Sequence, residues 1–134
     1  QALLPNGNSG SPEWSVEPVT NANWESAGNT NMDDSAYVYS NVVDDQDQYT
    51  IQSMVNTPVV FGVQVTGLYR QDDATQRSAC NVITSNSVEV EGAEFNTPSS
   101  YAASLDLFEN DPDTLVAWLP TAVNALTVGP KVKS

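Results

Sequence analysis

The sequence contains no histidine, one cysteine and only four basic side chains. The missing histidine excludes Ser-His-Asp and Cys-His catalysis, and only a serine–lysine pair stays formally open. Lys131 and Lys133 are predicted to lie in an edge strand near the C-terminal end, which is a poor place for such a pair. A single cysteine excludes an intrachain disulfide and leaves carboxylates as the only strong ligands for zinc or iron. We therefore expect a protein that is not an enzyme.

Positive charge is scarce as well. The chain carries 17 acidic side chains and a net charge of −13, whereas nucleic-acid binding needs Lys and Arg clustered on one face. The same charge would repel an anionic membrane surface. The longest apolar run, Val59 to Val63, is far shorter than the roughly 20 residues of a membrane helix. We expect a soluble acidic protein that binds neither nucleic acid nor membranes.

Alternating hydrophobicity begins at Ser35 and continues to the end of the chain. The face shared by Val63, Val65, Gly67 and Tyr69 shows the period of a strand with one side buried. Strand candidates are 36–40, 48–54, 59–70, 77–84, 87–91, 101–109 and 128–133, separated by turn clusters such as Asn56-Thr57-Pro58. This spacing predicts an all-β fold, a jelly-roll-like β-sandwich. Residues 62–70 and an alternating strand opened by Arg77 are expected to form a long central hairpin.

Two regions depart from the strand pattern. Residues 1–35 are rich in Asn, Gly, Ser and Pro, which predicts an extended, loop-rich N-terminal arm anchored by Trp14 and Trp24. The β-sandwich domain would then span residues 36–134. One short helix is expected, with Pro120 in its first turn, Gly129-Pro130 as its stop and Trp118 packed beneath it.

The acidic clusters are candidate calcium ligands, because calcium takes six to eight oxygen ligands. They are Asp33-Asp34, Asp44-Asp45 with Asp47, Asp72-Asp73, and Asp111 with Asp113. None matches the D-x-D-x-D-G loop pattern, and each lies where Asp would cap a turn. The sequence thus predicts turn residues and no cofactor, with a structural calcium as the alternative.

Other side chains have both a structural and a functional interpretation. Arg70 and Arg77 are expected to face each other across the hairpin, where they would either grip a partner's carboxylate or, as we favour, pair with acids of this chain. The Trp and Tyr residues could form a sugar-stacking platform, but Tyr37 and Tyr39 share one strand face, a pattern typical of core aromatics. Cys80 is expected to be a small buried apolar side chain.

The order of several motifs resembles a family of small structural proteins of tailed bacteriophages and prophages. The resemblance rests on Gly62-Val63-Gln64-Val65, Tyr69-Arg70, Asp72-Asp73-Ala74, Arg77-Ser78, Asp111-Pro112-Asp113-Thr114, Ala117-Trp118 and Val123-Asn124-Ala125. It extends over residues 1–134 through the Leu3–Asn8 opening, Trp24, Asp33-Asp34, Tyr37–Ser40, Asp44 and Asp47-Gln48-Tyr49. The chain departs from the family pattern at Leu119-Pro120, where a Trp-Thr pair would usually supply a threonine cap.

This resemblance implies a virion component, either a capsid decoration (cement) protein or a subunit of an external spike or fibre, and implies no reaction. Its partners would be other virion proteins and further copies of itself. A trimer is favoured, with the N-terminal arm laid along a neighbour to bury Leu3 and Leu4. The alternative is a β-sandwich that binds carbohydrate or a host receptor.

Replacing Trp118 by alanine should lower the free energy of unfolding by roughly 3–5 kcal/mol, because a buried indole is lost. Asp72→Asn with Asp73→Asn should change it by no more than about 0.5 kcal/mol if both are solvated turn residues. Urea unfolding of the two variants checks this. A stable Trp118→Ala protein that has lost a ligand or partner would instead make Trp118 a binding residue.

Overall fold

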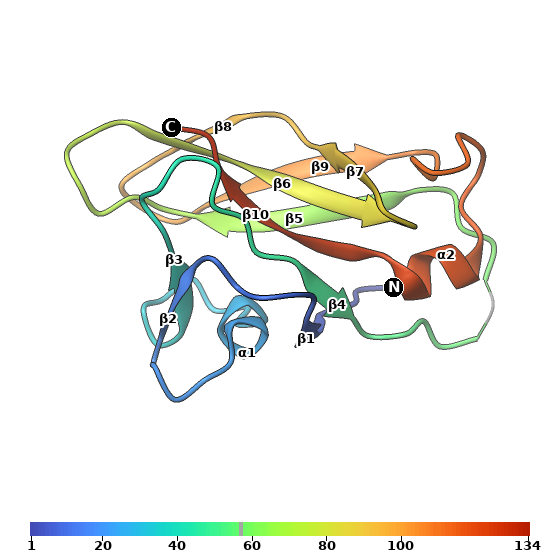
Figure 1. The fold of residues 1–134 in the computed structure, drawn as a ribbon, viewed down its shortest axis with the longest axis horizontal. Coiled ribbons are helices and arrows are strands. Elements are labelled where there is room, and N and C mark those ends of the chain that lie inside the picture. Colours follow the sequence, from blue (N-terminus) through green and yellow to red (C-terminus); the bar gives the residue numbers. More distant parts are fainter. Residues whose placement is uncertain (57) are drawn as a thin grey trace.

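The computed structural model describes residues 1–56 and 58–134. These residues form β1 (Pro5–Asn8), β2 (Ser15–Glu17), α1 (Asn23–Ala27), β3 (Tyr37–Tyr39), β4 (Tyr49–Ile51), β5 (Val63–Tyr69), β6 (Arg77–Ser85), β7 (Val88–Glu91), β8 (Phe95–Thr97), β9 (Ala102–Phe108), α2 (Pro120–Ala125) and β10 (Thr127–Val132). The fold is all-β, with antiparallel sheets and two short helices (Figure 1). Each of the seven predicted strand segments overlaps a strand of the structure, whereas β1, β2 and β8 were not predicted.

The strands form one large sheet and two small ones. The main sheet has six strands in the order β1-β4-β10-β6-β7, with β8 also paired to β6. β7 pairs with the end of β6 at Val82–Ser85, and β8 pairs with its beginning at Arg77–Ala79. The ribbon formed by β5 and β9 packs on β6, and β2 pairs with β3. Figure 1 shows β2, β3 and α1 grouped at one side of the molecule and α2 at one end of the long strands.

β6 is the central strand, and nearly all of its residues are buried. The expected alternation along β6 is therefore wrong, because this strand is covered on both faces and flanked by strands at both edges. Its Ile83 joins Ile51, Trp118, Val123 and Leu126 in the core cluster. Trp118 also donates its indole N–H to the carbonyl of Phe108 at 2.9 Å.

The expected central hairpin is wrong. β5 pairs with β9 in continuous register, from Val63 opposite Phe108 to Tyr69 opposite Ala102, and has no ladder with β6. The edges of β6 are occupied by β10 on one side and by β7 and β8 on the other, which leaves no place for β5. β5 crosses to the second layer and keeps its predicted alternation there, with Gln64 and Thr66 exposed.

Residues 1–35 are loop-rich, as expected, but they contain a second helix, so the prediction of a single helix is wrong. A helix of about one turn cannot form alone. In α1 the Glu25 carboxylate accepts a hydrogen bond from the Ala22 N–H at 2.7 Å, and the Asn8 side chain of β1 accepts one from the Trp24 N–H at 3.0 Å. Asn8 is distant from α1 in the sequence, so the hydrogen bond between Trp24 and Asn8 could not be predicted from the local sequence pattern. β1 pairs with β4 of the same chain.

Asp47 joins the N-terminal region to the main sheet. Its carboxylate is buried and accepts four hydrogen bonds, from the backbone N–H groups of Glu13 and Trp14 at 2.7 and 3.0 Å, from the Asn23 amide at 2.7 Å and from the Tyr49 hydroxyl at 2.7 Å. Burial, and then the Asp47 charge, raise the pKa of Tyr49. The phenol therefore stays protonated and acts as a donor.

The C-terminal part of the chain corrects two further expectations. α2 begins at Pro120 as predicted, but it ends before Gly129-Pro130, which lie within β10. Gly129 is needed there because a β-carbon would collide with the Asp47 carbonyl. β10 is an inner strand between β4 and β6 that contains Lys131, and Lys133 lies just beyond its end, so the prediction that both lysines lie in an edge strand is wrong. Neither helix in the described part of the chain is long and apolar enough to cross a membrane.

Asp47→Asn should lower the free energy of unfolding by roughly 3 kcal/mol. The asparagine amide has only one acceptor oxygen, and its NH₂ group would face N–H and O–H groups that are themselves donors. Asp44→Asn is the matched control. Asp44 is exposed and has φ 72, a conformation that asparagine tolerates, so its change should stay within about 0.5 kcal/mol. Equal urea midpoints for the two variants would contradict the role given to Asp47.

Candidate functional site

The second layer of the sandwich covers only part of the main sheet. The ribbon packs on β6 and β10, while the main sheet continues beyond it to β4 and β1. An open groove of about 1190 Å³ lies beside β5 in this uncovered region. This groove is the candidate functional site.

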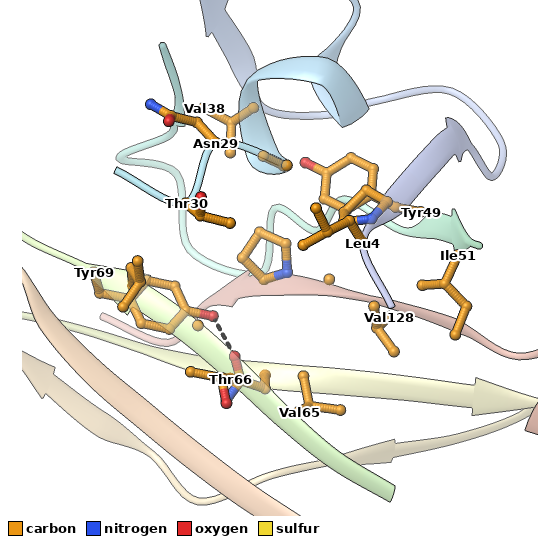
Figure 2. A pocket seen from close by; sticks show the side chains of 18 of the residues that line it. Leu4, Asn29, Thr30, Val38, Tyr49, Ile51, Val65, Thr66, Tyr69 and Val128 are labelled. Carbon is orange, nitrogen blue, oxygen red and sulfur yellow. Dashed lines mark hydrogen bonds between the residues drawn. The ribbon is translucent and has the colours of Figure 1, made fainter. Parts of the chain in front are cut away.

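The groove has two walls and an apolar floor (Figure 2). β5 contributes Val65, Thr66 and Tyr69 to one wall, and Leu4, Asn29, Thr30 and Val38 lie across from them. Between these walls lie Tyr49 and Ile51 of β4 and Val128 of β10. The Tyr69 hydroxyl donates to the Asn81 side chain at 2.8 Å, and burial raises the pKa of Tyr69, so this phenol is a neutral donor.

The edge of β5 that faces away from β9 is unpaired. β5 belongs to a two-stranded sheet, and within residues 1–56 and 58–134 no backbone hydrogen bond joins its other edge. A strand edge of this kind presents N–H and C=O groups that can pair with another chain. The groove therefore offers backbone hydrogen bonds as well as apolar contacts.

The groove and its surroundings carry little charge along β4 and β5. The sequence contains no charged residue between Asp47 and Arg70, although the whole chain has a net charge of −13. Charges gather at the Tyr69 end, where the Arg70 guanidinium lies 3.2 Å from the Asp34 carboxylate and over the Tyr101 ring. The Tyr101 hydroxyl donates to Asp34 at 2.9 Å, and burial followed by this bond raises the pKa of Tyr101.

Exposed apolar side chains border the groove. In the connection from β4 to β5, Phe61 is 90% exposed, Val59 78% and Val55 69%, and all three lie along the groove. Leu105 and Leu107 of β9 are exposed as well, but they do not line the groove. Exposed apolar side chains that gather beside a groove are typical of surfaces that contact other macromolecules.

The two arginines do not face each other as expected, because β5 and β6 lie in different sheets. The favoured alternative, pairing with acids of the same chain, is confirmed. Arg70 pairs with Asp34, and Arg77 pairs with Asp73 at 2.9 Å.

The aromatic residues differ in their exposure. Tyr37 and Tyr39 pack with ring centroids 5.9 Å apart, but Tyr39 is 51% exposed, so the prediction that this pair belongs to the core is wrong. β3 pairs only with β2 in a small sheet, which leaves one side of the pair open. Trp14 and Trp24 are half-buried, and Trp118 is buried.

The acidic clusters serve turns and buried bonds. Asp33 accepts the N–H of Ser35 and Asp111 that of Asp113, both at 3.0 Å, and Asp47 is the buried acceptor described above. Hydrogen bonds from Ser35 lower the pKa of Asp33. In the described ranges no three Cys, Asp or Glu side chains are placed to hold one metal ion. The structural calcium stays an untested prediction.

Lys131 and Lys133 hold a single carboxylate. Their ammonium groups lie 2.7 and 2.6 Å from the two oxygens of Glu91, and these hydrogen bonds lower the pKa of Glu91 and raise those of both lysines. Cys80, opposite Lys131 on β6, is buried, as predicted. Burial raises the pKa of its thiol to about 11, which keeps it neutral.

The groove was not predicted from the sequence. The predicted hairpin paired β5 with β6, whereas in the structure β5 pairs only with β9 and its other edge is free. One signal was available, namely the absence of charge between Asp47 and Arg70. Comparisons with protein-family models, curated proteins and solved structures find no match to this chain.

Cys80 should resist a disulfide-exchange reagent at pH 8 until the protein unfolds. Its raised pKa contributes stability that is fully present below the ordinary thiol value of 9.0 and is lost as the pH rises toward about 11. Across that range the melting temperature of the wild type should therefore fall more than that of Cys80→Ala. Parallel curves, or rapid labelling of the folded protein, would contradict the neutral buried thiol.

Proposed function

We propose that this protein is a non-enzymatic structural component of a tailed-phage virion, a capsid decoration protein or a subunit of an external spike or fibre. In this proposal it is a jelly-roll-like sandwich that acts on the particle by binding other virion proteins and copies of itself, with a trimer as the favoured assembly. It is assembled in the bacterial cytoplasm and resides on the virion.

One observation carries the proposal, namely the largely uncharged, apolar groove beside an unpaired strand edge on a strongly acidic chain. Phe61, Val59 and Val55 extend this apolar surface. Surfaces of this kind support binding to proteins. The motifs from Gly62 to Ser78 and from Asp111 to Ala125, which resemble the phage structural family, support the virion as the setting.

A second candidate function, the binding of a carbohydrate or host receptor, is favoured by the exposed Tyr37–Tyr39 pair. Aromatic rings that are open on one face can stack on sugars, and Asn29 and Thr30 at the neighbouring groove wall add polar groups. Both functions are compatible with a protein displayed on a particle.

Purified particles of the phage or induced prophage that encodes this chain should contain it at the stoichiometry of a structural protein, measured by quantitative mass spectrometry after density-gradient banding. A major capsid protein and a phage-encoded replication protein are the positive and negative controls. Absence from the particles beyond trace amounts would overturn the proposal. Glycan-array binding that is lost in Tyr39→Ala would, in that case, put the second candidate first.

A further inference from the structure

β5 differs from β1 and β7, the outer strands of the main sheet, in having none of the usual protection against strand addition. The outer strand β1 begins at Pro5 and has an irregular register between Pro5 and Gly7, and the outer strand β7 carries Glu89 and Glu91. Proline, irregular pairing and charge are the usual means of blocking a strand edge. β5 contains no proline or charged residue, and its register with β9 is unbroken over seven residues.

The free edge of β5 also borders the apolar floor of the groove. A strand added beside β5 would lie in the groove over Tyr49, Ile51 and Val128 of the main sheet. Its alternate side chains would point down onto these residues, because side chains alternate along a strand. The added strand would thus extend the second layer over the part of the main sheet that the ribbon leaves open.

We propose that the groove binds an extended strand of a partner polypeptide, which pairs with the free edge of β5 and completes the second layer of the sandwich. This inference deepens the proposed function by naming how a partner is held. Only the identification of the partner as a virion protein rests on that function. The general mode is strand addition, in which backbone bonds supply affinity and pockets for alternate side chains supply specificity.

The wall opposite β5 favours a single strand as the occupant. Leu4, Asn29, Thr30 and Val38 close the side opposite β5, so the added strand has a wall beyond it. β5 of a second copy is backed by β9, so it would bring a second strand that meets this wall. A segment without a neighbouring strand on its outer side fits.

Charge defines the partner's chemistry further. Away from its Tyr69 end the groove is lined by uncharged side chains, and the chain as a whole has a net charge of −13. Near the Tyr69 end, Asp33, Asp34, Asp72 and Asp73 outnumber Arg70 and Arg77. A strand antiparallel to β5 would begin at this end, so the best occupant has basic residues at its start and alternating apolar residues after them.

The test uses the full chain and a fluorescent peptide of about nine residues, two lysines followed by alternating valine and threonine. The control peptide has the same sequence with N-methyl groups on alternate residues, which remove backbone donors and keep the side chains. Fluorescence anisotropy gives both affinities, and amide hydrogen exchange by NMR reports on β5. We expect the control to bind at least about tenfold more weakly, and exchange in β5 to slow only with the first peptide.

Two protein variants provide a matched pair. Leu4→Asp places a charge in the groove wall, whereas Leu105→Asp places one on the exposed outer face of β9. Leu4→Asp should weaken binding by about tenfold or more, and Leu105→Asp should leave it within about twofold. Thermal unfolding shows whether each variant is folded, and the two peptides on the wild type remain decisive if Leu4→Asp is not.

Equal affinity for the two peptides, no binding, or unchanged exchange in β5 would overturn the inference. Protection of β5 that grows with protein concentration in the absence of peptide would also overturn it, because the occupant would then be a second copy. These outcomes are separate from the particle test. A protein that is present in virions but does not bind the peptide retains the proposed function, and one that binds it but is absent from virions loses that function alone.

Discussion

The burial of the Asp47 carboxylate is the constraint on which the arrangement of the N-terminal region depends. A charge removed from water is tolerated only when donors replace its hydration. Two of the four donors are backbone groups at residues 13 and 14, and a third is the side chain of Asn23, the first residue of α1. The loop-rich first third of the chain must therefore close onto β4 for the main sheet to form without an unsatisfied charge.

The same residue constrains the opposite strand through its backbone. The Asp47 N–H donates to the Pro130 carbonyl at 3.1 Å, and its carbonyl lies where any side chain at position 129 would have to be. Asp47 thus binds the N-terminal region through its side chain and contacts β10 through its backbone. A change there acts on two parts of the fold together.

Strand positions could be predicted from the sequence much better than strand partners could. Alternation placed β5, and the Pro120 signal placed α2, because both depend on local pattern. The pairing of β5 with β9 depends on which edges of β6 are already filled, and α1 depends on a cap from Asn8. The groove results from these non-local choices, so only its lack of charge was visible in the sequence.

The pairing of all four basic side chains has a consequence for how copies of the protein meet. Arg70, Arg77, Lys131 and Lys133 each lie within an ion pair with a carboxylate of the same chain. Approaching molecules therefore experience a field that is almost uniformly negative beyond the neutral groove. Because dissolved ions screen such repulsion over about 8 Å at physiological ionic strength, salt should promote the crowding of this protein on a surface, the reverse of its effect on proteins that bind nucleic acid.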